Sequence, residues 1–356
     1  MAVLFALVAV VAAAGTGTAR VPCGQREHLA LARPPANTAY AGAFPFFSTA
    51  TRNEDAVTAA RMASFEARAG KHLAWAAFSN HWDGGRVRFP KESVERIWQH
   101  GSLPLVRMLP WSRQELGKAD PVFRLRDLAR GRWDPELEAW ADGARRTGVP
   151  VMIDFAPEMN GDWFPWSGAL SGGRAGTRAY RDAYRHIVDL FRARGAANVS
   201  FAFHVDAEGA PAAPWNVPRA YYPGDRYVDW VGASVYGSDD VGQSWRGLAP
   251  QLERAYAAVR AAAPRKPFAL FEWGVVEDPR AGDKGRWIRD AFAALRTKRL
   301  SGVRAVSWWD ERWMREDGRW NDSRISSSSG ALSAYRDGIG DRRYLGRPAT
   351  ACVPDR

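Results

Sequence analysis

Eight short apolar runs, separated by stretches with helical periodicity, constrain the fold of this 356-residue chain more than any other feature. The runs occupy residues 40–46, 72–79, 104–111, 150–158, 199–205, 227–237, 266–274 and 303–310. Helical segments lie between them, among them 53–70, 133–148, 177–195 and 248–263. This alternation predicts a single-domain (β/α)8 TIM barrel. A doubly wound open sheet is the alternative, but the G-x-G-x-x-G fingerprint expected after its first strand is absent from GAFPFFS.

The predicted barrel also indicates where reactive side chains should gather, because barrel active sites lie at the carboxyl ends of the strands. Glu158 ends the fourth run and Glu272 nearly ends the seventh, so we expect the two carboxyl groups to face one another across the barrel mouth. Glycoside hydrolysis needs such a pair. One carboxylic acid protonates the leaving oxygen, and the other carboxylate attacks the anomeric carbon or activates water.

Aromatic and amide side chains surround both glutamates. Sugars stack their flat C–H faces on aromatic rings and bond their hydroxyls to amides, so these residues suit a carbohydrate ligand. Asn160 could hold a sugar hydroxyl or bond the loop backbone instead, and each Trp could pack in the core instead. We predict substrate-binding roles for Asn160, Trp163, Trp166, Tyr236, Trp309, Trp111, His81, Trp82, His204 and Trp273.

A metal at His204 and Asp206 is not expected, because further ligands at suitable spacing are absent. We predict neither a metal nor an organic cofactor. His204 is expected to be a hydrogen-bond partner in the site or a barrel residue. Asp154 lies four residues before Glu158 on the same strand and points the same way. We expect it to pair with Arg107 of the neighbouring strand.

The motifs around the two glutamates also resemble a known family. EMNGDWFPW (158–166) resembles the acid/base motif of glycoside hydrolase family 26, and LFEWG (270–274) resembles its nucleophile strand. YYPGDRYVDWVGASVYG (221–237) is similar to its sixth strand and the loop before it. The resemblance implies a retaining β-glycanase on a (β/α)8 barrel. It also implies that Glu158 is the general acid/base, Glu272 the nucleophile and Tyr236 its neighbour, with no cofactor.

The chain departs from the family pattern at three places. The family usually has Arg three residues before a His, and that His directly before the acid Glu; here these positions hold Asp154 and Pro157. Phe203-His204 stands where the family has a Trp. Pro157 cannot donate a side-chain hydrogen bond, so the sequence does not imply mannan specificity, although mannanases, mixed-linkage glucanases and β-1,3-xylanases all occur in the family.

We therefore expect a retaining endo-β-glycanase that hydrolyses a mannan-like polysaccharide, a mixed-linkage glucan, or a bacterial exopolysaccharide or cell-envelope glycan. One alternative is a transglycosylase that remodels an exopolysaccharide, since it would use the same covalent intermediate. Another is a non-catalytic glycan-binding barrel, against which the presence of both glutamates argues.

The ends of the chain predict export. Residues 2–14 are apolar and small residues follow, which predicts a signal peptide over 1–19, with an uncleaved anchor as the alternative. The only cysteines, Cys23 and Cys352, flank the expected domain and suit a disulfide that ties the termini together. We expect an N-terminal extension (20–38), a catalytic domain (39–340) and a C-terminal tail (341–356) in a secreted or extracytoplasmic monomer.

The net charge of +11 makes nucleic acid a partner to consider. However, the basic residues are mostly Arg and are scattered, with no run of five or more. The sequence therefore favours a polysaccharide partner, and no nucleic acid.

Overall fold

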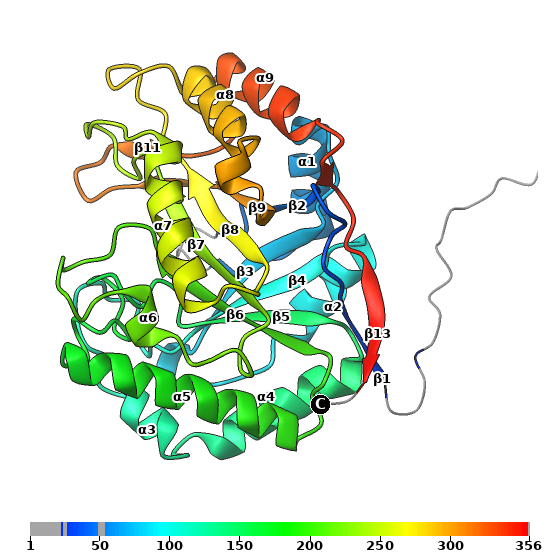
Figure 1. The fold of residues 1–356 in the computed structure, drawn as a ribbon, viewed down its shortest axis with the longest axis vertical. Helices are drawn as coiled ribbons and strands as arrows, with labels where there is room; N and C mark the ends of the chain where they lie inside the picture. Colours follow the sequence, from blue (N-terminus) through cyan, green and yellow to red (C-terminus); the bar gives the residue numbers. More distant parts are fainter. Residues whose placement is uncertain (1–22, 24–26, 49–53, 355–356) are drawn as a thin grey trace, which may run out of the picture.

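Eight parallel strands close into a barrel in the computed structural model, which describes residues 23, 27–48 and 54–354 (Figure 1). Each strand pairs with the next along the chain, and β2 pairs with β9 to close the sheet. The strands are β2 (Ala39–Pro45), β3 (Trp75–His81), β4 (Leu103–Leu109), β5 (Val151–Phe155), β6 (Val199–Asp206), β7 (Trp230–Tyr236), β8 (Phe268–Gly274) and β9 (Val303–Asp310). Each of the eight predicted runs overlaps one of these strands, and the predicted (β/α)8 barrel is confirmed.

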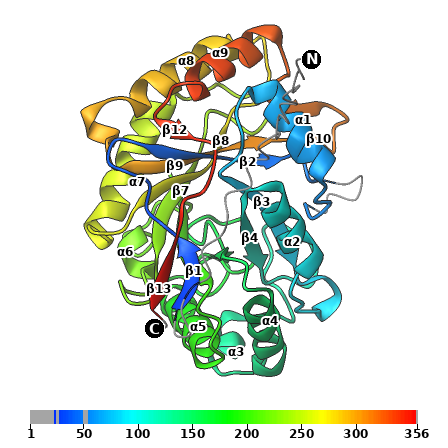
Figure 2. The same ribbon diagram turned by 90° about the vertical axis from the view of Figure 1, so that its right-hand side faces the viewer.

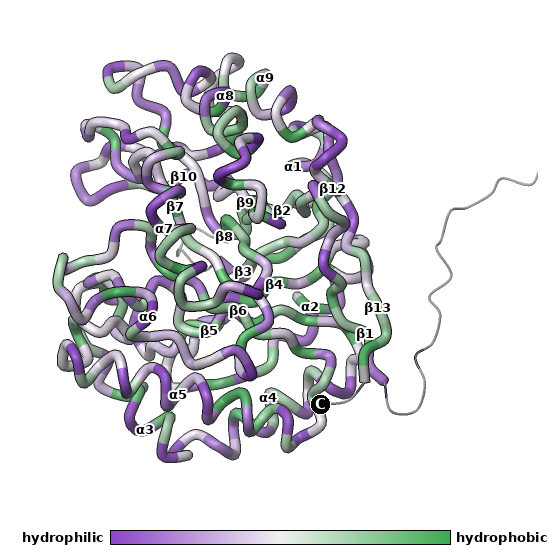
Figure 3. The backbone as a smooth tube through the Cα atoms, in the orientation of Figure 1, coloured by the Kyte–Doolittle hydropathy of each residue, from purple (hydrophilic) through white to green (hydrophobic). Residues whose placement is uncertain are grey.

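Helices cover the outside of the barrel (Figures 1 and 2). They are α1 (Ala59–Ala69), α2 (Lys91–His100), α3 (Leu125–Ala129), α4 (Asp134–Thr147), α5 (Arg174–Ala193), α6 (Pro218–Tyr221), α7 (Leu248–Ala262), α8 (Lys284–Leu295) and α9 (Ser329–Ile339). Hydrophobic and hydrophilic residues alternate along the outer helices, as Figure 3 shows for α5. This periodicity buries one face of each helix against the sheet. The four helical segments predicted from sequence correspond to α1, α4, α5 and α7.

Aromatic rings fill the barrel interior near the amino-terminal ends of the strands. Trp75 packs on Trp230 and Phe271, with ring centroids 5.9 and 6.1 Å away. Gly42 makes room for this cluster, because a Cβ there would lie 1.9 Å from the Trp75 indole nitrogen. The amino-terminal half of the barrel interior is therefore closely packed, and the polar side chains of the barrel mouth lie above it.

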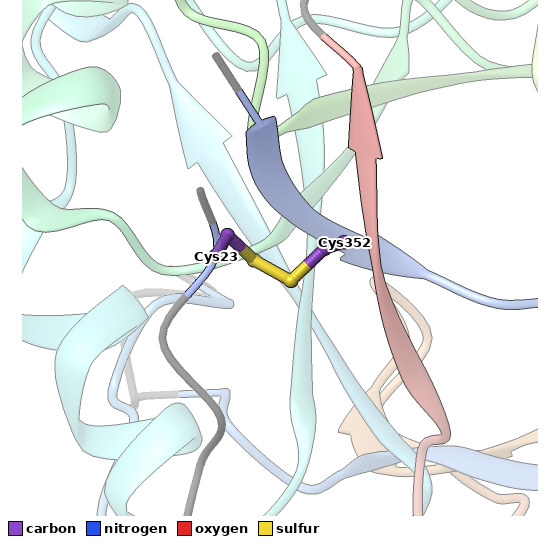
Figure 4. Close-up of a disulfide and its surroundings, with 2 residues drawn as sticks. All are labelled: Cys23 and Cys352. Atoms are coloured by element: carbon purple, nitrogen blue, oxygen red, sulfur yellow. A yellow bond between two sulfur atoms is a disulfide. The ribbon is translucent and has the colours of Figure 1, made fainter. Parts of the chain in front are cut away.

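The two ends of the described chain meet as an antiparallel ribbon. Strand β1 (Glu27–Leu31) pairs with β13 (Thr350–Pro354), and a Cys23–Cys352 disulfide joins them (Figure 4). The ribbon lies against the amino-terminal ends of the barrel strands, where Leu31 and Val353 share a cavity with Trp230. The predicted disulfide is confirmed. Strand β12 (Tyr344–Leu345) also extends the sheet by pairing with β2.

The predicted signal peptide, residues 1–19, lies outside the described residues. Within the described part of the chain, none of the helices has the length and apolar character that crossing a bilayer requires.

Loss of the disulfide should destabilise the fold. In the double variant Cys23→Ser/Cys352→Ser, we expect the free energy of unfolding to fall by roughly 2–5 kcal/mol, because the cross-link restrains the unfolded chain across a long loop. The two cysteines are 329 residues apart in sequence. Denaturant unfolding followed by circular dichroism, without reductant, measures the change. Equal midpoints for the variant and the native protein would contradict the prediction.

Candidate active site

A cavity of about 590 Å³ opens at the carboxyl ends of the barrel strands. Glu158, which follows β5, and Glu272, within β8, both line it. One oxygen of Glu158 and one oxygen of Glu272 lie within 4.8 Å of each other. The structure therefore brings together the two carboxyl groups that the sequence singled out.

The chain turns sharply after β5 to present Glu158. Ala156 and Glu158 both adopt positive φ angles, 48° and 56°. Such backbone costs roughly 1–3 kcal/mol per residue and persists only where neighbours hold it. Here Ala156 N–H donates to the Met108 carbonyl at 3.0 Å, and Glu158 N–H donates to the His204 carbonyl at 2.8 Å. The adjacent strands thus hold a strained turn that points the Glu158 side chain into the mouth.

Glu158 is protonated at neutral pH. Burial, together with the nearby charges of Glu272 and Asp206, raises its pKa to about 8. The Trp163 indole N–H donates to Glu158 Oε2 at 3.0 Å. Glu158 can therefore deliver a proton, and Trp163 can stabilise the carboxylate that results.

Glu272 is held at both oxygens. Its Oε1 lies 2.9 Å from Arg107 Nε, and its Oε2 accepts a hydrogen bond from the Tyr236 hydroxyl at 3.0 Å. The predicted position of Tyr236 beside Glu272 agrees with this contact. A cation beside one oxygen and a hydroxyl bonded to the other restrict the rotation of this carboxyl group.

The predicted pair between Arg107 and Asp154 is wrong. The two residues are neighbours in the β4–β5 register, but Arg107 bonds Glu272 and Glu54 instead. Asp154 Oδ2 lies 2.7 Å from His204 Nδ1. The longer side chain of Arg107 reaches past Asp154 to the mouth, whereas the shorter side chain of Asp154 contacts the His204 ring on β6.

His204 lies below the glutamates and does not line the cavity. Its Nε2 is 2.7 Å from Ser234 Oγ, so both ring nitrogens have partners. Burial alone would lower its pKa, but the charge of Asp154 and the hydrogen bond to it raise the pKa above the ordinary value. Although His204 lies within 4.8 Å of Glu158 and Glu272, it has no uncommitted nitrogen to offer a metal ion.

Five of the predicted substrate-binding residues do line the cavity: His81, Trp111, Trp163, Tyr236 and Trp309. The indole of Trp309 is nevertheless covered on its faces. Phe44 stacks on it at a centroid distance of 4.0 Å, and the Arg107 guanidinium lies 4.8 Å over the ring. Trp309 therefore shapes the cavity floor and does not offer a free face for a sugar.

Three further predicted residues pack around the mouth and do not line the cavity. Trp166 lies under Phe164, and its N–H donates to the Pro157 carbonyl. Trp82 packs on Phe123, and Trp273 packs outward on Trp308 near α8. Alternation along the strand explains Trp273, which must face away from the barrel interior if Glu272 faces it.

Asn160 bonds the loop backbone, which is the second of the two roles expected for it. Its amide nitrogen donates to the Asp206 carbonyl, and its amide oxygen accepts from the Asp206 N–H, both at 2.8 Å. The side chain thus ties the loop after β5 to the end of β6. The nitrogen and the oxygen of the amide therefore both have backbone partners.

Sequence reasoning missed several cavity residues, among them Glu54, Phe164, Ser234 and Glu311. Phe164 and Glu311 carried a signal, since one lies inside the WFPW stretch and the other directly follows the eighth run. Glu54 carried no such signal, because a charged residue near the start of a predicted helical segment is typical of a solvent-exposed surface. Only the fold brings it to within 2.6 Å of Arg107.

The raised pKa of Glu158 predicts a pH-dependent stability difference. The folded protein keeps a proton that the unfolded chain, with its ordinary pKa of 4.5, releases. The stability contributed by this proton is complete below about pH 4.5 and is lost as the pH rises through about 8. The variant Glu158→Gln should therefore gain stability relative to the native protein between pH 5 and pH 9, as measured by paired melting curves. A constant difference across this range would contradict the prediction.

Comparison with known proteins agrees with this geometry. The family described as Glycosyl hydrolase family 26 matches residues 134–262. The chain is 30% identical over 250 residues to Endoglucanase H of Acetivibrio thermocellus, covering 69% of this chain and 25% of that protein. It is 22% identical over 242 residues to β-1,3-xylanase TXYA of a Vibrio species, covering 62% and 50%. The chain thus spans between a quarter and a half of the length of these relatives.

Solved structures share the fold. A Bacillus subtilis mannanase aligns with a TM-score of 0.58 at 19% identity, covering 89% of this chain and 88% of that one. A family 26 protein of Muricauda aligns with a TM-score of 0.62 at 16% identity, covering 87% of each chain. Together, the sequence matches and the shared barrel confirm that this chain resembles glycoside hydrolase family 26, as its EMNG and FEWG motifs predict.

Proposed function

We propose that this protein is a retaining endo-β-glycanase with Glu158 as general acid/base and Glu272 as nucleophile. One observation carries the proposal: oxygens of the two buried carboxyl groups lie within 4.8 Å of each other. Retaining glycosidases separate their carboxyl groups by about 5–5.5 Å, and inverting ones by about 6.5–9.5 Å to admit a water molecule. The spacing supports direct attack by Glu272 on the sugar.

The proposed reaction has two displacements. In the first, Glu272 attacks the anomeric carbon while Glu158 gives its proton to the leaving oxygen, which breaks the glycosidic bond and leaves a glycosyl ester on Glu272. In the second, ionised Glu158 takes a proton from water, the water oxygen bonds the anomeric carbon, and Glu272 leaves as a carboxylate. Trp163 would stabilise the ionised form of Glu158 between the two steps.

The substrate in this proposal is a β-linked polysaccharide, and glucan is the first polymer to test. The relative that matches at 30% identity is named an endoglucanase, while others are named β-1,3-xylanase and mannan endo-1,4-β-mannosidase. Mannan, mixed-linkage glucan and bacterial exopolysaccharide all remain within the proposal. Pro157, in the place of the family's His, supports including polymers other than mannan.

Chain organisation belongs to the same proposal. We place the catalytic unit at residues 39–340, with the segments before and after it forming the disulfide-linked ribbon of β1 and β13. The disulfide supports a location outside the cytoplasm.

Both glutamates should be essential for cleavage. Against a panel of mannans, mixed-linkage glucan, xylans and bacterial exopolysaccharides, we expect oligosaccharide release by native protein from at least one polymer. Glu158→Gln and Glu272→Gln should each reduce this release by roughly 10²–10⁴-fold or more. Mass spectrometry of products measures release, and products longer than the input would indicate transglycosylation. Silence on every polymer, or full activity in either variant, would overturn the proposal.

Activity should fall on the alkaline side as Glu158 loses its proton. Because burial raises the Glu158 pKa to about 8, kcat/KM on a polysaccharide should decline as the pH rises past that value. An aryl β-glycoside with a good leaving group needs no acid, so Glu158→Gln should cleave it and show no such decline. Initial rates between pH 6 and pH 10 test this. An alkaline decline that persists on the aryl substrate in Glu158→Gln would assign it to another group.

A further inference from the structure

Glu54 lies at the barrel mouth, in the segment that connects β2 to α1, where its side chain is 21% exposed. Its carboxylate Oε2 accepts hydrogen bonds from Arg107 Nη1 at 2.6 Å and from the Ser79 hydroxyl. Its backbone carbonyl accepts from the Ser79 N–H at 2.9 Å. Strand β3 therefore fixes Glu54 at both its backbone and its side chain.

Arg107 connects Glu54 to the candidate nucleophile. Its guanidinium donates a hydrogen bond from Nη1 to Glu54 at 2.6 Å and forms an ion pair with Glu272, whose Oε1 lies 2.9 Å from Nε. Arg107 Nη1 also donates to Ser79 Oγ at 2.9 Å, and the group lies over the covered face of Trp309. The guanidinium is almost fully buried, so its two carboxylate partners share one positive charge in a setting with little water.

The other charged groups nearby do not displace the bridge, by which we mean the contact of Arg107 with both Glu54 and Glu272. The titratable and charged groups that face Arg107 and Glu272 are Glu54, His81, Asp154, Glu158, His204, Tyr236 and Glu311. Asp154 is committed to His204 at 2.7 Å, and Tyr236 bonds the other oxygen of Glu272. Among these groups, Glu54 is the one whose carboxylate bonds the same guanidinium as Glu272.

We propose that Glu54 is a positioning residue for the nucleophile, acting through Arg107. It anchors the far side of the guanidinium, which holds Glu272 Oε1 in place, and it takes part of the positive charge that would otherwise act on Glu272 alone. The inference rests on the proposed function, because it assigns Glu272 the nucleophilic role.

The test is Glu54→Gln, which keeps the shape of the side chain and removes its charge. We expect kcat to fall by about 10- to 100-fold with little change in KM, because the nucleophile is displaced while the substrate contacts remain. Glu253→Gln, which changes a partly exposed carboxylate on α7 that pairs with Arg299, serves as the control and should alter neither kcat nor KM.

A merely structural role for Glu54 would lower the melting temperature and leave the kcat of the folded protein unchanged. Unchanged kcat in folded Glu54→Gln would therefore overturn the proposal. If that variant does not fold, Ser79→Ala, which removes the hydroxyl bonded to both Glu54 and Arg107, should show a smaller fall in kcat with little change in KM.

A second readout needs no activity, and so separates this proposal from the proposed function. Glu54→Gln, Glu272→Gln and their double variant are compared by denaturant unfolding. With both carboxylates gone, the buried guanidinium has neither partner, so the double variant should lose more stability than the sum of the single changes. Additive changes would overturn the bridge even in a protein inactive on every polymer. A non-additive cycle in an inactive protein would support the bridge and count against the enzymatic role alone.

Discussion

The site depends on holding two buried acidic groups within 4.8 Å of each other at the barrel mouth. Two carboxylates at this spacing would repel strongly if both were ionised. The structure avoids this repulsion by giving the two carboxyl groups different surroundings. Glu158 keeps a proton because burial and nearby charge raise its pKa to about 8, whereas Glu272 receives the guanidinium of Arg107. Two chemically identical side chains thus stand in different environments, which supports the separate roles of acid and nucleophile proposed for them.

Layers of side chains beneath the mouth make this arrangement rigid. Directly under the glutamates, the buried His204–Asp154 pair forms a polar contact. The Phe271 ring packs on His204 with a centroid distance of 4.9 Å and continues into the aromatic cluster around Trp75. The strained turn at Ala156 and Glu158 therefore lies above a packed layer of side chains. Packing elsewhere in the barrel therefore offsets the conformational strain of that turn.

The positions at which the motifs differ from the family pattern make defined contacts in this chain. Asp154, at the position where the resemblance leads one to expect Arg, is a register neighbour of Arg107 and pairs with His204. The positive charge beside Glu272 comes from Arg107. Pro157 keeps the turn after β5 and offers its carbonyl to Trp166.

The sequence by itself determined the barrel, the pair of glutamates and the disulfide. Alternating periodicity reports which face of each element is buried, and strand ends of a closed barrel must converge, so Glu158 and Glu272 could be placed without coordinates. Only the tertiary structure decided which partners these groups have. Glu54, the Arg107 bridge and the covered faces of Trp309 depend on side-chain lengths and on contacts between distant segments. Local patterns carry no record of such contacts, because a charged or aromatic residue has the same periodicity whether it packs, pairs or binds.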